Sequence, residues 1–177
     1  MLQHSNKQKY ALVGTGHRGT SMWGRDIQSD WSEQINFVGL CDLNKTRLSI
    51  AHAEIAAQTS LYNNFDQMLA EQRPDLLAVC TPDHNHDEFI IKALMSGADV
   101  ITEKPMTTTL DKAKAIRKAE ADSGRKIKVA FNYRFIPVLA KIKKLLLART
   151  IGKINSIDFH WYLDTKHGAD YFRRWHA

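Results

Sequence analysis

The chain has 177 residues, of which 44% are hydrophobic and 25% charged, with 25 Lys and Arg against 19 Asp and Glu. This length allows one domain and part of a second, and the composition is typical of a soluble globular protein. No apolar run approaches the ~18 residues of a membrane-spanning helix, and the start of the chain lacks the apolar stretch of a secretory signal. We therefore expect a cytoplasmic protein that does not enter a membrane.

Apolar strand-like runs alternate with helical patterns along most of the chain. Strands are predicted at 10–13, 35–41, 76–80, 100–102 and 127–131, and helices at 18–30, 43–57, 65–71, 87–95, 110–123 and from Pro137 onward. Strands that alternate with helices indicate a parallel sheet covered on both faces. The predicted fold class is therefore α/β, a doubly wound parallel sheet.

The pattern changes after Gly152. In KINSIDFHWYL, residues 153–163, side chains such as Ile157, Phe159 and Trp161 alternate with those of the other face. This alternation predicts a strand of an antiparallel sheet with one open face. We therefore expect a first domain at residues 1–151 and the beginning of a second, α+β domain at 152–177.

Two cysteines occur, Cys41 and Cys80, and each ends an apolar run. Cysteines in such places are usually buried thiols. A CxxC pair or a zinc-binding set is absent. His84 and His86 lie two residues apart, but two ligands without a nearby third do not make a metal site. The sequence therefore predicts no bound metal.

The net charge of +6 fits either a nucleic-acid-binding protein or the basic part of a molecule that binds an anionic cofactor. Val138, Ile142 and Leu145 recur at helical spacing in VLAKIKKLLL, and the lysines fall on the other faces, as in an ordinary amphipathic helix. Basic and aromatic residues are not interleaved as in RNA-binding strands. We therefore predict no nucleic-acid partner.

The first predicted strand leads into three glycines spaced as G-x-G-x-x-G, namely Gly14, Gly16 and Gly19. Between a strand and a helix, this spacing is typical of a dinucleotide-binding turn. Gly14 allows the tight turn, Gly16 lets the backbone approach a pyrophosphate, and Gly19 permits close packing of helix on strand. The free N–H groups at the helix start then face the phosphates. His17 and Arg18 lie beside them, and Arg18 could add a charge-assisted bond.

Asp42 directly follows the second predicted strand. An acid at this place accepts hydrogen bonds from a ribose diol and repels a 2′-phosphate, which favours NAD over NADP. Arg47, with Lys45 nearby, could in principle reach such a phosphate. Asp42 or Asn44 is also the expected N-cap of the next helix. S-adenosylmethionine enzymes use similar features and stay possible at this point, whereas the absence of G-K-[ST] argues against a P-loop triphosphatase.

Three further polar stretches follow later predicted strands: CTPDHNH at 80–86, TEKPM at 102–106 and FNYRF at 131–135. Ligands of an open parallel sheet bind outside the carboxyl ends of its strands. We therefore expect all three stretches at the same edge of the sheet as the glycine loop.

Five motifs come in a particular order and spacing: GTGHRG at 14–19, CD at 41–42, TPDHNH at 81–86, EKP at 103–105 and NYR at 132–134. In these motifs the sequence resembles the Gfo/Idh/MocA oxidoreductases, the relatives of glucose–fructose oxidoreductase and inositol dehydrogenase. The resemblance covers roughly Lys9 to Ile151. It implies that residues 1–151 form a Rossmann-type dinucleotide-binding domain for NAD, with NADP less expected. It also implies a sugar or polyol substrate and a homo-oligomeric full-length form.

The resemblance also implies roles for individual residues. The expected pyrophosphate and ribose contacts are Gly14, Gly16, His17, Arg18 and Asp42. The loop along the cofactor matches Thr81, Pro82 and His86, the segment by the nicotinamide ribose matches Glu103 and Lys104, and a position beside the nicotinamide matches Asn132. Lys104 is the one expected catalytic residue, because its ammonium would hydrogen-bond the substrate hydroxyl and stabilise a developing alkoxide.

The base that takes the hydroxyl proton comes, in this family, from the second domain after a Gly-Gly segment, which this sequence lacks. Asp164 and His167 could be mistaken for the family's acid–histidine pair, but Gly168 favours a loop. We therefore expect a truncated piece of a longer oxidoreductase, with weak or no turnover by itself. The alternatives are a non-catalytic NAD-binding or assembly module and an NAD-dependent glycoside-cleaving relative.

Overall fold

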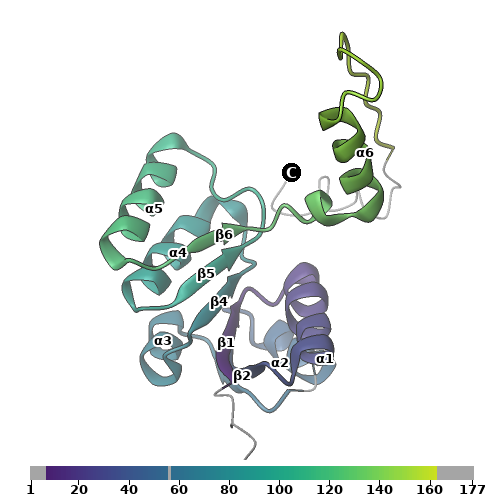
Figure 1. Cartoon of the computed structure of the whole chain (residues 1–177). Coiled ribbons are helices and arrows are strands. Elements are labelled where there is room, and N and C mark those ends of the chain that lie inside the picture. Colours follow the sequence, from purple (N-terminus) through teal and green to yellow (C-terminus); the bar gives the residue numbers. More distant parts are fainter. Residues whose placement is uncertain (1–6, 56, 163–177) are drawn as a thin grey trace, which may run out of the picture. The chain divides into compact units, whose positions relative to one another are not determined.

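The computed structural model of the chain describes residues 7–55 and 57–162. Its sheet has six parallel strands in the order β3-β2-β1-β4-β5-β6 (Figure 1). The strands are β1 (Gln8–Val13), β2 (Ile35–Cys41), β3 (Ser60–Tyr62), β4 (Leu76–Val79), β5 (Asp99–Thr102) and β6 (Ile127–Val129). This is the strand order of a Rossmann fold, so the predicted doubly wound α/β class is confirmed.

Helices lie on both faces of the sheet (Figure 1). The helices are η1 (Gly19–Asp26, a π-helix), α1 (Ile27–Trp31), α2 (Lys45–Ile55), α3 (Phe65–Gln72), α4 (His86–Met95), α5 (Leu110–Ser123) and α6 (Pro137–Leu147), with two 3₁₀ turns, η2 (Asp83–Asn85) and η3 (Asn132–Phe135). Helices α3, α4 and α5 pack on one face of the sheet, and η1, α1 and α2 pack on the other.

The side chains of β1 show how this arrangement divides the core. Ala11 and Val13 belong to the apolar cluster under α3, α4 and α5, whereas Tyr10 and Leu12 belong to the cluster under α2. All four side chains are buried. A strand buried on both faces needs a continuous apolar run rather than an alternating one, which is why residues 10–13 are apolar throughout.

Local capping signals set the ends of helix α5. The hydroxyl of Thr109 accepts a hydrogen bond from the backbone N–H of Lys112 at 3.4 Å, which satisfies a free donor at the helix start. Gly124 ends the helix in the left-handed region, with a φ of 66°, where glycine is the favoured residue. Both bounds of the helix predicted at 110–123 are confirmed.

Strand β3 and the first helix both differ from the sequence-based expectation, and β6 ends at Val129 instead of residue 131. Strand β3 was not predicted, because three residues are too few to show a periodic pattern. The helix predicted at 18–30 is divided into the π-helix η1 and the short α-helix α1, which ends at Trp31. None of these differences moves the residues that follow the strands of the sheet.

The chain divides into two compact units, Met1–Ala130 and Phe131–Ala177. The first unit contains the whole sheet and helices η1 to α5, and the second contains η3 and α6. The division precedes residue 151, where the sequence predicts the end of the cofactor domain. The assignment of residues 1–151 and 152–177 to two functional domains stays a prediction.

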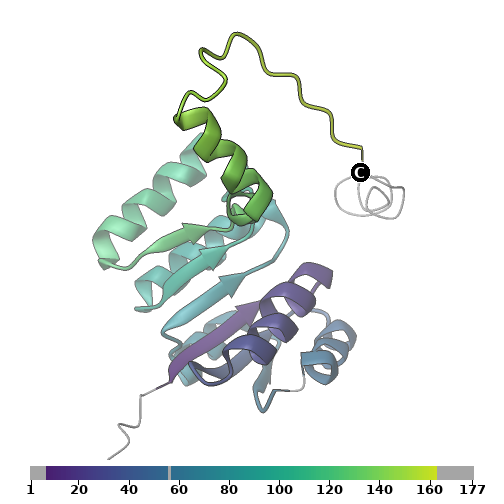
Figure 2. The same ribbon diagram turned by 45° about the vertical axis from the view of Figure 1, so that its right-hand side comes forward.

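The strand expected at 153–163 is not present in the part of it that the structure describes. Residues 153–162 have neither helix nor strand assignment and follow an irregular, open path (Figure 2). A strand is held by hydrogen bonds to a neighbouring strand, and the amides of 153–162 donate no backbone hydrogen bond to any described residue. The alternating pattern is therefore real in the sequence, but the strand prediction is wrong for this structure.

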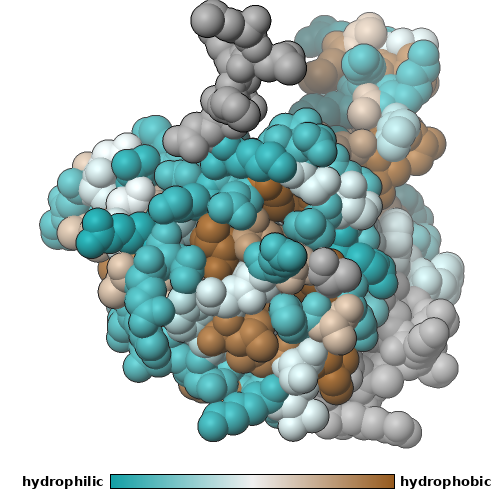
Figure 3. Space-filling model, turned by 90° about the horizontal axis from the view of Figure 1, so that it is seen from below, coloured by the Kyte–Doolittle hydropathy of each residue, from teal (hydrophilic) through white to brown (hydrophobic). Residues whose placement is uncertain are grey.

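The surface on the side that Figure 3 shows is mostly hydrophilic, and apolar residues reach it in small separate areas. Within residues 7–55 and 57–162, none of the helices combines the length and the apolar character needed to cross a bilayer.

Candidate cofactor-binding site

Four strands end in register at one edge of the sheet. Val13 pairs with Cys41 on one side and with Val79 on the other, and Val79 pairs with Thr102. A backbone hydrogen bond extends each of these pairings by one residue. The residues that follow the strands therefore lie next to one another along the edge, in the order Asp42, Gly14, Cys80 and Glu103.

The three glycines of the loop differ in the space around them. Gly14 has a φ of 88°, and a Cβ there would lie 2.5 Å from the backbone carbon of Cys80. A Cβ at Gly19 would lie 2.0 Å from the carbonyl oxygen of Gly14. A Cβ at Gly16, by contrast, would have no atom within 4 Å. Gly14 and Gly19 are thus required by the fold, whereas Gly16 leaves open space that a ligand can use.

The helix after the loop begins at this open space. The backbone N–H of Thr20 donates to the carbonyl of Gly16 at 2.8 Å, as in the first turn of a helix. The N–H groups before it have no acceptor within the helix. The side chains of His17 and Arg18 are exposed beside them. This arrangement suits an anionic group.

Asp42 braces the glycine loop from the next strand. Its Oδ2 accepts hydrogen bonds from the backbone N–H and the hydroxyl of Thr15, both at 2.9 Å. Its Oδ1 accepts from the backbone N–H of Asn44 at 2.8 Å. The side chain is 9% exposed, and Arg47 Nη1 lies 3.6 Å from Oδ2. The carboxylate is therefore fixed at the edge of the loop and partly balanced by a cation.

The N-cap of α2 is Asn44 and not Asp42. Asn44 Oδ1 accepts the backbone N–H of Arg47 at 3.0 Å, which is the hydrogen bond of an N-cap. The sequence left both residues open for this role. The structure gives the cap to Asn44, so the Asp42 carboxylate is not used to cap the helix.

Glu103 receives two donors from the helix that follows the glycine loop. Its Oε1 accepts from the indole N–H of Trp23 at 2.9 Å and forms an ion pair with Arg18 Nε at 3.2 Å. The Glu103 side chain is 11% exposed. Burial raises the pKa of the Cys80 thiol, and the negative charge of Glu103 raises that pKa further, whereas Arg18 lowers it. The buried carboxylate of Glu103 needs the donors Trp23 and Arg18, because a buried charge without partners is unfavourable.

His86 joins the two loops that follow β4 and β5. It is 1% exposed, with Nδ1 2.9 Å from the carbonyl oxygen of Pro105 and Nε2 2.7 Å from that of Thr81. His86 therefore lies under the loops rather than at their surface, and it fixes them relative to each other. Thr81 and Pro82 are half-buried, and the hydroxyl of Thr81 is buried with no hydrogen-bond partner among the described residues.

Of the remaining expected residues, some lie in the described part of the chain and some lie outside it. Lys104 is exposed directly after the buried Glu103, and it makes no hydrogen bond or ion pair with a described residue. Asn132 starts turn η3 in the second unit, where its Oδ1 accepts the backbone N–H of Tyr133 at 3.1 Å. Asp164 and His167 lie outside the described residues.

Two residues at this edge were missed by the sequence reasoning. Thr15 could have been found, because it lies inside the glycine loop and has a hydroxyl that suits the expected acid at the second strand. Trp23 gave no signal, because its partner Glu103 lies 80 residues further along the chain. Only the packing of η1 beside the end of β5 brings them together.

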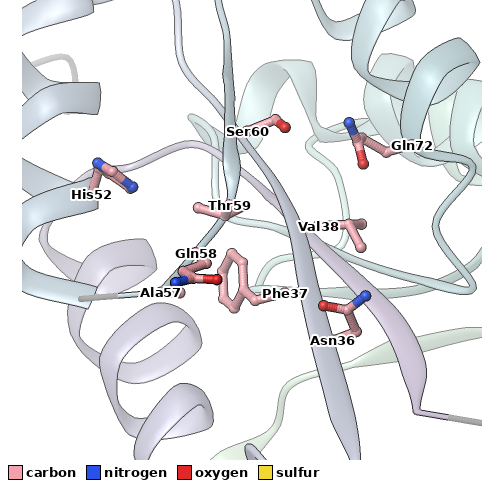
Figure 4. A pocket seen from close by; sticks show the side chains of 9 residues that line it. All are labelled: Asn36, Phe37, Val38, His52, Ala57, Gln58, Thr59, Ser60 and Gln72. Atoms are coloured by element: carbon pink, nitrogen blue, oxygen red, sulfur yellow. The ribbon is translucent and has the colours of Figure 1, made fainter.

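Neither a metal site nor a deep cavity among the described residues competes with this edge. In the described part of the chain, no three His, Cys, Asp or Glu side chains gather closely enough to hold a metal ion. A cavity of about 570 Å³ opens beside the first half of β2 and is lined by residues such as Asn36, His52 and Gln72 (Figure 4). It lies away from the carboxyl ends of the strands, where Asp42 and the glycine loop are.

The residues at the carboxyl edge fit a dinucleotide. The open space at Gly16 suits a pyrophosphate, the fixed carboxylate of Asp42 suits ribose hydroxyls, and the Thr81 hydroxyl offers an unused hydrogen-bonding group. The site is thus polar and pre-formed, and it lies where open α/β sheets bind their ligands.

Known proteins are similar to this chain in sequence. The protein YteT of Bacillus subtilis is 38% identical over 168 residues, which cover 93% of this chain and 39% of YteT. An inositol 2-dehydrogenase of Rhodococcus erythropolis is 37% identical over 140 residues, which cover 76% of this chain and 40% of the enzyme. The chain therefore spans about two fifths of the length of these relatives.

Solved structures share the fold. The WlbA dehydrogenase from Bordetella pertussis, in complex with NADH and UDP-GlcNAcA, superimposes with a TM-score of 0.77 at 27% identity, over 85% of this chain and 42% of WlbA. Residues 8–131 match the profile of the oxidoreductase family with an NAD-binding Rossmann fold. Since this match covers more than half of the sequence, the chain belongs to the Gfo/Idh/MocA oxidoreductase family.

Proposed function

We propose that this chain binds NAD(H) as the cofactor domain of an oxidoreductase that interconverts a hydroxyl and a carbonyl group on a sugar or polyol. The observation that carries this proposal is the fixed carboxylate of Asp42 beside the open space at Gly16. The names of the relatives support the substrate class, since one is an inositol 2-dehydrogenase and WlbA was solved with NADH and UDP-GlcNAcA.

Each part of the edge has a role in this proposal. The open backbone at Gly16 and the free N–H groups at the helix start would hold the pyrophosphate. The Asp42 carboxylate would accept hydrogen bonds from ribose hydroxyls. A nicotinamide cofactor held by these residues would supply hydride-transfer chemistry for a carbinol or a carbonyl group. The exposed ammonium of Lys104 would hydrogen-bond the substrate oxygen and stabilise its negative charge. The other proposed cofactor contacts are Gly14, His17, Arg18, Thr81, Pro82, Glu103 and Asn132, and the buried His86 would act by holding the loop of Thr81 and Pro82 in place.

We further propose that the cofactor is NAD rather than NADP. A 2′-phosphate would lie beside the Asp42 carboxylate, and two negative charges placed close together repel each other. Arg47 and the nearby Lys45 are cations that would favour the phosphate, but Arg47 already pairs with Asp42 at 3.6 Å. Its charge is therefore partly used within the protein.

We assign the group that takes the hydroxyl proton to the part of the full-length protein that this chain does not span. The chain by itself would then bind NADH but turn over a sugar weakly or not at all. In full-length form the protein would act in the cytoplasm as a homo-oligomer.

Calorimetric titration of the 177-residue chain with NADH and NADPH tests the proposal. We expect NADH to bind at least about tenfold more tightly than NADPH, and Asp42→Ala to weaken NADH binding by roughly ten- to a hundredfold, as expected for lost hydrogen bonds to a charged group. Asp111→Ala is the control, since this side chain is 95% exposed on α5. No NADH binding by the wild-type chain, or equal affinities in wild type and Asp42→Ala, would contradict the proposal.

A further inference from the structure

Trp23 makes one hydrogen bond through its indole and one through its backbone carbonyl, although it does not belong to any of the sequence motifs. Its indole N–H donates to Glu103 Oε1 at 2.9 Å, and its own carbonyl accepts the hydroxyl of Tyr10 at 2.8 Å. Tyr10 is buried in β1. The backbone of Trp23 is therefore tied to β1, and its indole is tied to Glu103, the residue before Lys104.

The carboxylate oxygen that Trp23 binds is the one that Arg18 also binds. Arg18 Nε lies 3.2 Å from Glu103 Oε1. The two terminal nitrogens of the Arg18 guanidinium donate no hydrogen bond within the described part of the chain. Arg18 is 45% exposed at the start of the helix, directly before Gly19. Its inner nitrogen is thus fixed while its outer nitrogens stay available.

We propose that Trp23 is a positioning residue for the binding of an anionic group at the glycine loop. Trp23 fixes Glu103, and Glu103 holds Arg18 by Nε, so that the two outer nitrogens are ready to bind phosphate oxygens. This inference rests on the proposed NAD(H) function, because the pyrophosphate is the anion that the loop would hold.

Pre-organisation is the physical reason for such an arrangement. A free arginine side chain loses rotamer freedom when it binds a ligand, and this loss of entropy weakens binding. An arginine that the protein already holds loses less. The indole N–H also helps to compensate the buried charge of Glu103, which keeps the carboxylate in place as the partner of Arg18. Without that N–H, Arg18 is the one side chain among the described residues that still pairs with the Glu103 carboxylate.

The test is a set of NADH titrations of the full 177-residue chain. Trp23→Phe keeps an aromatic ring and removes only the donor, so we expect NADH binding to weaken roughly three- to tenfold, the range of one hydrogen bond of modest net worth. Trp31→Phe is the matched control, because Trp31 is exposed in α1 and its side chain makes no hydrogen bond or ring contact with a described residue. Arg18→Ala, at a half-exposed side chain, should weaken binding at least as much as Trp23→Phe.

A double mutant separates positioning from a general loss of packing. In the Arg18→Ala background, Trp23→Phe should change the NADH affinity by less than about twofold, because coupled residues are not additive. An effect of Trp23→Phe that persists at full size without Arg18 overturns the proposal. Unchanged affinity in Arg18→Ala also overturns it, and this outcome does not depend on how well Trp23→Phe folds. If the wild type does not bind NADH, the proposed function fails; if Asp42→Ala weakens binding while Trp23→Phe does not, only this inference fails.

Discussion

At the scale of single residues, the edge of the sheet combines charged side chains that are exposed with charged side chains that are buried and bound by other residues. Lys104 is exposed, but its neighbour Glu103 is buried and bound by Trp23 and Arg18. Within the EKP motif, Glu103 directly follows β5, and Lys104 lies in the bend after it. One residue can therefore face a ligand while the other belongs to the protein's own network.

Cys41, at the end of β2, leads to a prediction on pH. Burial and the nearby charge of Asp42 raise the pKa of this thiol from 9.0 to about 12. The unfolded chain therefore loses the thiol proton at lower pH than the folded one. The stabilising contribution is complete below pH 9 and is lost as the pH rises towards 12.

We expect the free energy of unfolding to fall between pH 9 and 11 by up to ~1.4 kcal/mol per pH unit from this residue alone. Urea denaturation at several pH values measures it. Cys41→Ala should show a correspondingly smaller fall, since the titrating group is gone. Equal slopes for wild type and variant would show that Cys41 ionises equally easily in the folded and unfolded chain.

At the scale of elements, the turn from β1 into η1 separates what the fold needs from what a ligand needs. Gly19 touches the backbone of Gly14, whereas Gly16 borders open space. The two glycines belong to one motif, but a methyl group added at each would have different consequences.

We predict that Gly19→Ala destabilises the chain by about 1–3 kcal/mol, because overpacking forces the backbone apart. Gly16→Ala should leave the thermal midpoint close to that of the wild type and weaken NADH binding more than about tenfold, since its methyl group would occupy the space for the pyrophosphate. Thermal denaturation and calorimetry on both variants measure this contrast. Full NADH affinity in Gly16→Ala would show that the ligand does not approach this backbone.

At the scale of the whole molecule, the two compact units are built differently. The first unit has a sheet with both faces covered and two apolar clusters. The second has helix α6, with Val138, Ile142 and Leu145 exposed, and the irregular segment 153–162. Backbone protection should therefore differ sharply between the units.

Hydrogen exchange measures this difference. Amides of 153–162 should exchange near the rate of an unstructured peptide, because they donate no backbone hydrogen bond among the described residues. Amides of the central strands β1 and β4 should be protected by orders of magnitude. Saturating NADH should slow exchange in the glycine loop and leave 153–162 unchanged. Slow exchange at 153–162 in the chain alone would contradict the irregular structure of this segment.

Much of the fold could be predicted because its signals are local. The bounds of β2 and α5 follow from an apolar run and from a cap with a terminal glycine. Strand β3 has too few residues to show a pattern. The strand prediction at 153–163 failed for the opposite reason. The alternating pattern is clear, but a strand also needs a hydrogen-bonded neighbouring strand, which a local pattern does not supply.

The sequence by itself determined the doubly wound sheet, the glycine loop and the place of Asp42 at its edge, because each depends on residues close together in the chain and on the parallel arrangement of strands. Only the tertiary structure decided that Asn44 caps α2, that His86 lies beneath two loops, and that Trp23 and Arg18 share one oxygen of Glu103. These contacts depend on the angles and distances at which packed elements meet. Such geometry is set by the whole core and is not encoded in any single stretch of residues.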